Sequence, residues 1–197
     1  MWGLNLKGSL INFASIGSSD VNVWDTFMSD NGGSPSADPN VWITDSSDVE
    51  FLWGAVFGEG FHPSGGGDGE IAAYNSTNVR INGTQVLDSG ASAIYFVNCD
   101  SCRVENATLL NAAGWGLDIV GGSDNFTAVN NYVQGSQYGG SVFHQNTQSG
   151  GTYTGNTFIN NNTGGYASCN AINVAGNPAA LTLSGNTATP GPITCIQ

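Results

Sequence analysis

Short triplets with the pattern apolar, any residue, apolar recur along this chain at nearly regular intervals. Successive members of the first series begin 21 to 30 residues apart. Two further apolar segments follow most triplets after short polar turns, so a typical repeat holds three segments. Triplets with side-chain period two are typical of β-strands, and three short strands bury only a thin slice of core. The repeats must therefore stack, which predicts a β-solenoid. The first series comprises residues 11–13, 41–43, 71–73, 94–96, 117–119, 142–144, 172–174 and 193–195.

Composition excludes several other classes of protein. Only 9% of the 197 residues are charged and 29 are Gly, which excludes a helical bundle. A β-propeller blade needs about 40 to 45 residues and four strands, more than one repeat supplies. With 3 Lys and Arg against 15 Asp and Glu, the net charge of -12 repels nucleic acid and anionic lipid. No apolar run approaches the roughly 18 residues that span a bilayer, so we expect no membrane span.

Asparagine recurs in the turn that follows the second segment of a repeat. It tolerates the left-handed backbone conformation and can hydrogen-bond its equivalents one repeat away. The positions are Asn82, Asn106, Asn130, Asn131, Asn156 and Asn186. With these turns the repeat resembles the right-handed parallel β-helix superfamily, the fold of pectate lyases, polygalacturonases, alginate epimerases and phage tailspikes. The resemblance spans nearly the whole chain and implies an all-β, single-stranded right-handed parallel β-helix of about seven coils. In it, Ile94, Leu117 and Ile172 should share one aliphatic ladder.

The catalytic motifs of the superfamily are mostly missing. Residues 114–120 are similar to the Y-G-x-D-P-H signature of alginate epimerases, but Trp115, Ile119 and Val120 replace its tyrosine, proline and histidine. Asp118 and one glycine match. The polygalacturonase elements N-T-D, D-D and G-H-G are absent, as is the R-x-P-x-x-R of pectate lyases. The resemblance therefore assigns no catalytic residue, and whether the protein is an enzyme stays open.

The middle residues of the first triplet series point to one side of the predicted sheet. Among them are Trp42, Tyr95 and Phe143, with Asp118 between the last two. Pyranose rings pack their C–H faces on aromatic rings and offer hydroxyls to carboxylates. These four residues are the candidate ligand-binding face, for a neutral polysaccharide or glycan surface lying lengthwise along the solenoid. The alternatives are that the rings only cover the sheet, and that a one-residue shift exchanges Phe143 with a neighbour.

The outward residues of the second series form an alternative face for an anionic ligand. They include Glu50, Arg80 and Arg103. The two arginines would stand one coil apart, about 5 Å, and repel unless Glu50, Glu105 or an anionic ligand lies between them. In the superfamily's lyases an arginine or lysine commonly acts as base or carboxylate clamp on this face, which implies uronate binding. A solvated ladder of ion pairs is the competing interpretation.

Two insertions, at 29–40 and 58–70, should meet on adjacent coils and gather carboxylates. Crowded carboxylates attract divalent cations, so Ca²⁺ is the cofactor that the sequence suggests, although no EF-hand spacing is present. The candidate ligands are Asp30, Asp38, Glu59, Asp68 and Glu70. No other cofactor is expected.

These features together predict one β-helix domain over residues 1–197, displayed outside the cell, on a cell surface or on a virion, that contacts polysaccharide. Because neither end shows a capping helix, we expect a fragment or an oligomer subunit whose end coils meet other protein chains. The alternatives are a structural or assembly subunit of a virion spike, surface layer or fibre, and a truncated polysaccharide lyase, epimerase or hydrolase. The pairing of the four cysteines, Cys99, Cys102, Cys169 and Cys195, is left open.

Overall fold

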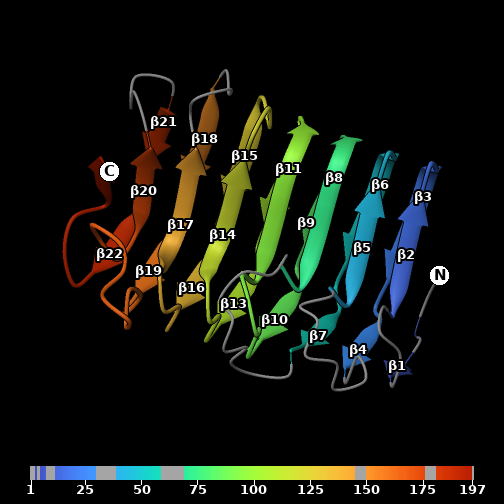
Figure 1. The fold of residues 1–197 in the computed structure, drawn as a ribbon, viewed down its shortest axis with the longest axis horizontal. Coiled ribbons are helices and arrows are strands. Elements are labelled where there is room, and N and C mark those ends of the chain that lie inside the picture. The colour runs from blue at the N-terminus through green and yellow to red at the C-terminus, as the bar shows by residue number, and fades with distance from the viewer. Residues whose placement is uncertain are drawn as a thin grey trace.

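The chain forms a β-solenoid in which strands from successive coils lie side by side (Figure 1). The computed structural model describes residues 3, 5–7, 12–29, 39–58, 69–144, 150–175 and 181–196. Every pairing between described strands is parallel, for example that of β11 with β8 and β14. None of the described residues forms a helix long and apolar enough to cross a membrane. The solenoid predicted from the triplet repeat is therefore confirmed.

A typical coil contributes one strand to each of three ladders, here named sheets 1, 2 and 3, and a pairing of Ser47 with Thr77 joins sheets 1 and 2 into one continuous 15-stranded sheet. Sheet 1 contains β2 (Phe13–Ile16), β5 (Val41–Thr44), β8 (Ile71–Thr77), β11 (Ile94–Asp100), β14 (Trp115–Val120), β17 (Gly139–His144), β20 (Ile172–Ala175) and β23 (Thr194–Ile196). Sheet 2 contains β3 (Ser19–Trp24), β6 (Ser47–Leu52), β9 (Arg80–Asn82), β12 (Arg103–Glu105), β15 (Phe126–Val129), β18 (Gly151–Thr154) and β21 (Leu181–Ser184). Sheet 3 contains β1 (Asn5–Lys7), β4 (Phe27–Ser29), β7 (Ala55–Phe57), β10 (Gln85–Leu87), β13 (Thr108–Leu110), β16 (Tyr132–Gln134), β19 (Thr157–Ile159) and β22 (Thr187–Thr189).

The interior is built from ladders of inward side chains. In sheet 1, Ile94 pairs with Leu117, and the same row continues through Ser141 to Ile172. All four are fully buried, so the expected aliphatic ladder is confirmed with one polar member. Ser141 is tolerated there because its hydroxyl and that of buried Tyr153 share a hydrogen bond of 2.9 Å.

Asparagine ladders close the turns between sheets 2 and 3, as the sequence predicts. The side-chain oxygen of Asn156 accepts hydrogen bonds of 2.9 Å from the backbone N–H and the side-chain amide of Asn131. The Asn156 amide in turn donates to Asn186 and to the backbone oxygen of Ala128. Since the three side chains are buried and satisfied by one another, each coil fixes the turn of the next.

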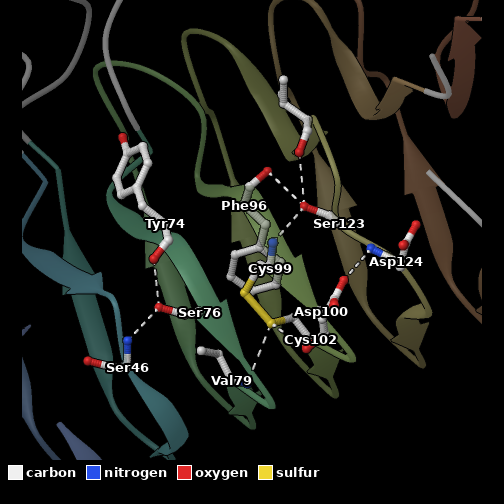
Figure 2. Close-up of a disulfide and its surroundings, with 11 residues drawn as sticks. Ser46, Tyr74, Ser76, Val79, Phe96, Cys99, Asp100, Cys102, Ser123 and Asp124 are labelled. Atoms are coloured by element: carbon white, nitrogen blue, oxygen red, sulfur yellow. Dashed lines mark hydrogen bonds between the residues drawn. A yellow bond between two sulfur atoms is a disulfide. The ribbon is translucent and has the colours of Figure 1, made fainter. Parts of the chain in front are cut away.

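A serine ladder and a disulfide occupy the turns between sheets 1 and 2 (Figure 2). The Ser76 hydroxyl accepts a hydrogen bond from the Ser46 backbone, and the Ser123 hydroxyl accepts one from the Cys99 backbone. Between them the buried Cys99 bonds to Cys102, and a second disulfide joins Cys169 to Cys195. The Cys-x-x-Cys motif therefore belongs to the packed interior.

Candidate functional site

The outer face of sheet 1 carries most of the predicted ligand-binding row. Strand register places Ala72 beside both Trp42 and Tyr95, and Tyr95 beside Asp118. Trp42, Tyr95 and Asp118 are all half-buried, whereas Ala72 is fully covered. The predicted positions of these three side chains on one face are confirmed, and their role in binding stays a prediction.

The expectation that Phe143 belongs to this row is wrong. β17 pairs Val142 with Asp118, and Phe143 is paired in register with Ile119. The register shifts because Ser141, two residues before Phe143, takes an inward position against the hydroxyl of Tyr153. The triplet pattern does not predict this register, because only apolar residues are assigned to inward positions and Ser141 is polar.

Aromatic rings beyond the triplets extend the face along several coils. Tyr74 lies with its ring centroid 5.3 Å from Trp42 and 5.9 Å from Tyr95. Period two places Tyr74 on the same side as Ala72, so the sequence contained a signal for it.

A second run of rings lies on the other side of Asp118. The ring of Trp115 is 6.0 Å from that of Tyr138, which is 4.7 Å from that of Tyr166. Tyr166 is 66% exposed, whereas Trp115 and Tyr138 are half-buried. Tyr138 directly precedes β17, and Tyr166 lies in the connection between β19 and β20. The triplet pattern does not predict the path of either connection. Rings therefore flank Asp118 along the solenoid axis.

Asp118 lines a small pocket together with Trp115 and Tyr138 of the second run. The pocket has a volume of about 80 Å³, which is room for a few waters or for one substituent of a ligand, and too little for a sugar ring. Its wall consists of small turn residues together with Trp115 and Tyr138. The lining residues are Gly90, Ala91, Ser92, Ala113, Gly114, Trp115, Asp118 and Tyr138.

Ser92 positions the carboxyl group of Asp118. Its hydroxyl donates a hydrogen bond of 3.3 Å to Asp118 Oδ2 and accepts one of 3.2 Å from the Trp115 backbone. Gly114 leaves the space for this arrangement, because a Cβ there would lie 2.9 Å from both the nitrogen and the hydroxyl of Ser92. Burial raises the pKa of Asp118 to about 7, and the Ser92 hydrogen bond opposes the shift. The pocket thus holds a carboxyl group that exchanges a proton near neutral pH.

The alternative anionic-ligand face lies on sheet 2 and is filled by ion pairs. Arg80 Nε donates to Glu105 over 2.9 Å and Nη1 donates to Glu50 over 3.2 Å, while Arg103 pairs with the other oxygen of Glu105. The hydrogen bond to Glu105, followed by that to Glu50, raises the pKa of Arg80. Carboxylates of the chain itself therefore occupy the place that a uronate would take between the arginines.

The predicted metal site falls mostly outside the described residues, where Asp30, Asp38, Glu59 and Asp68 lie. Glu70 is buried and accepts a hydrogen bond from the side-chain amide of Asn40. In the part of the chain that the structure describes, no three His, Cys, Asp or Glu side chains are grouped so that they could hold a metal ion. The calcium site stays a prediction.

Comparison with known proteins defines the family. The sequence matches the model of the right-handed β-helix region over residues 15–149. This match covers more than half of the chain, which therefore belongs to the right-handed β-helix family. A comparison with curated proteins found no match. A solved structure of QnrB1, a plasmid-mediated fluoroquinolone resistance protein, is similar at 11% identity over 95% of this chain and 92% of that chain, with a TM-score of 0.21, too low to support an argument.

Proposed function

We propose that this β-helix binds a neutral polysaccharide along the outer face of sheet 1, with the Asp118 pocket at the centre of the site. The observation that carries the proposal is that Asp118, which is paired in register with Tyr95 of one aromatic run, lines a pocket whose wall contains Trp115 and Tyr138 of the other run. Parallel coils place equivalent residues about 4.8 Å apart, so these rings offer repeated stacking surfaces to a chain of sugars.

The size of the pocket decides how such a ligand would lie. A volume of about 80 Å³ admits one hydroxyl, hydroxymethyl or similar substituent but not a pyranose ring. The ring would stay outside against Trp115 and Tyr138, and the substituent would reach Asp118 and the Ser92 hydroxyl. The carboxyl group and the turn backbone would supply hydrogen bonds, and the rings would supply apolar contact.

Charge favours a neutral glycan over a polyanion. The net charge of -12 repels an anionic chain at long range. Among the described residues that line the pocket none is a cation, and the arginines of sheet 2 are engaged by Glu50 and Glu105. A uronate would therefore have to displace existing ion pairs.

Two disulfides support a location outside the cytoplasm as part of this proposal. Cys99–Cys102 and Cys169–Cys195 are bonds that form and persist in oxidising compartments. We place the protein outside the cell, on a cell surface or on a virion, where polysaccharide is the partner that its aromatic face would meet.

The test is a screen of neutral and acidic glycans followed by titration calorimetry of variants. Trp115→Ala should weaken binding of the best neutral ligand by about 1 to 2 kcal/mol, because one stacking surface is lost. Tyr132→Ala is the matched control, since Tyr132 lies in β16 on sheet 3. Equal affinity of the Trp115 variant and the parent for every ligand found, or binding of acidic glycans alone, would refute the proposal.

A further inference from the structure

At one turn position between sheets 2 and 3, a tryptophan stands where the other coils have glycine, asparagine or aspartate. The residues that take this position on successive coils have left-handed backbone, with φ between 45° and 67°. They are Gly3, Asp25, Trp53, Gly83, Asn106, Asn130, Gly155 and Gly185. Glycine, asparagine and aspartate adopt this conformation readily, whereas a bulky aromatic residue does so under strain. Trp53, with φ of 45°, is the aromatic member of the set.

The strain at Trp53 is not offset by burial, because its side chain is 56% exposed. The indole lies instead between two surface neighbours. Its ring centroid is 6.1 Å from that of Trp24, itself 41% exposed, at an angle of 81°. On the next coil Gly83 leaves room for it, since a Cβ at Gly83 would be 2.2 Å from Trp53 Cδ1. A strained residue held in place by its surroundings without contributing to the core indicates a role at the surface.

A hollow of about 350 Å³ opens beside the indole. Phe27, 39% exposed and 4.9 Å from the ring of Phe57, forms another part of its wall. The remaining lining residues are small or polar, and none of the described residues that line it is a cation. The lining residues are Asp25, Thr26, Phe27, Trp53, Gly54, Ala55, Gly83 and Gln85. Aromatic faces beside a carboxylate and a primary amide are the groups that bind a hydroxyl-rich ring.

We propose that Trp24, Trp53 and Phe27 form a second carbohydrate site, for a neutral glycan, at the turn between sheets 2 and 3. The site is separate from the Asp118 pocket on sheet 1, and it rests on the proposed function for its ligand class. Its hollow lies within the range of about 300 to 1,000 Å³ that is usual for small-ligand sites, so one or two sugar rings fit.

A protein partner fits this surface less well than a glycan does. A stable protein interface buries roughly 1,200 to 2,000 Å² with a continuous packed centre. Here Trp53 and Phe27 border an open hollow, and Asp25 and Gln85 interrupt the apolar surface. The overall charge of -12 also opposes contact between two copies of the chain.

The deciding variant is Trp53→Asn, because Asn106 and Asn130 occupy the same turn position with φ of 51° and 53°. The variant should therefore fold with a melting temperature equal to or above that of the parent. Its affinity for a neutral oligosaccharide at this site should fall at least about tenfold, since a stacking surface is removed. Tyr132→Ala on sheet 3 is again the control and should bind as the parent does.

Titration calorimetry with short neutral oligosaccharides separates the two sites. The parent should bind two ligands per chain, Trp53→Asn and Trp115→Ala should each weaken a different one of the two sites by about tenfold, and the double variant should weaken both. Ligand should also shift tryptophan fluorescence in Trp115→Ala, and this shift should disappear in the double variant. Loss of binding in Trp115→Ala alone would overturn the second site and leave the proposed function standing, whereas loss in Trp53→Asn alone would do the reverse.

Two other results would overturn the second site. A lower melting temperature of Trp53→Asn with unchanged binding would show that Trp53 serves the fold. Sedimentation of the parent as a dimer that Trp53→Asn converts to a monomer would show that the surface joins two copies of this chain.

Discussion

The hydroxyl of Ser92 donates a hydrogen bond to Asp118 Oδ2 over 3.3 Å, across neighbouring coils and at the edge of a pocket. This contact stabilises the ionised form, yet burial outweighs it and raises the pKa of Asp118 from 3.8 to about 7. The folded protein therefore holds this proton more tightly than the unfolded chain does. The contribution of Asp118 to stability therefore falls as pH rises from about 4 to about 7, by at most about 4 kcal/mol at 1.36 kcal/mol per pKa unit.

Asp118→Asn should remove this pH dependence. The neutral amide has no proton to lose, so the variant should match the parent near pH 4 and exceed its free energy of unfolding above pH 7. Urea unfolding at pH 4, 6 and 8 measures the difference between the two proteins. Asp88→Asn, at an exposed turn where Asn111 and Asn160 have the same left-handed conformation, is the control. A difference between Asp118→Asn and the parent that is constant with pH would contradict the prediction.

The core ladder of sheet 1 predicts a second result. Leu117 lies between Ile94 and Ser141 and is fully buried. Leu117→Asp places a carboxylate in the stack without a partner and should abolish cooperative folding, whereas Leu117→Ala should cost about 2 to 5 kcal/mol. Circular dichroism during thermal unfolding distinguishes the two. A folded Leu117→Asp variant would show that the interior can repack around the charge.

The triplet pattern predicts the solenoid and the faces of its sheets because strand period and repeat stacking are set by local apolar spacing. It places Trp42, Tyr95 and Asp118 on one side correctly. It fails at Phe143, because a buried hydrogen bond between Ser141 and Tyr153 shifts the register. No spacing rule reports a polar pair of that kind.

Turn residues could be predicted less well than strand residues. Ser92 reaches Asp118 from a turn whose path depends on tertiary contacts, and the triplets carry no information about it. Trp53 is different, since aligning the repeats places it with Gly83, Asn106 and Asn130. A tryptophan at a position otherwise held by glycine, asparagine or aspartate is visible in the aligned repeats, and the structure adds that its ring is exposed.

The buried asparagine ladder predicts a large cost for a small change. Asn156→Ala removes the acceptor of the buried Asn131 backbone N–H and the side-chain donor to the Ala128 carbonyl, while Asn186 keeps the hydrogen bond from the backbone of residue 156. The variant should lose about 2 to 4 kcal/mol in urea unfolding, since each orphaned buried polar group costs about 1 to 3 kcal/mol. Thr182→Ala, on the exposed side of β21, should change stability by less than about 0.5 kcal/mol. Equal effects of the two changes would mean that water replaces the ladder.

The two disulfides should contribute unequally to stability. Cys169–Cys195 closes a separation of 26 residues, whereas Cys99–Cys102 closes one of 3. Because restriction of the unfolded chain grows with loop length, replacing Cys169 and Cys195 by serine should cost about 3 kcal/mol, and replacing the other pair should cost less. Urea unfolding of the two double variants, each compared with the parent, gives the ranking. The reverse order would assign the larger role to packing around Cys99 and Cys102.

Glu105 tests the alternative face of sheet 2. Its two carboxylate oxygens form ion pairs with Arg80 and Arg103, which occupy neighbouring register positions on adjacent strands. Glu105→Gln leaves two neighbouring guanidinium groups with Glu50 as the remaining carboxylate contact, so the variant should be less stable than the parent in low salt and recover part of the loss in high salt.

The arginines freed by Glu105→Gln should also give the variant a measurable affinity for uronic oligosaccharides that the parent lacks. Titration calorimetry with matched neutral and uronic ligands checks this, with Glu50→Gln as the control for a lost surface charge. Tight uronate binding by the parent, weakened by Arg80→Ala and unaffected by Trp115→Ala, would move the ligand site to sheet 2.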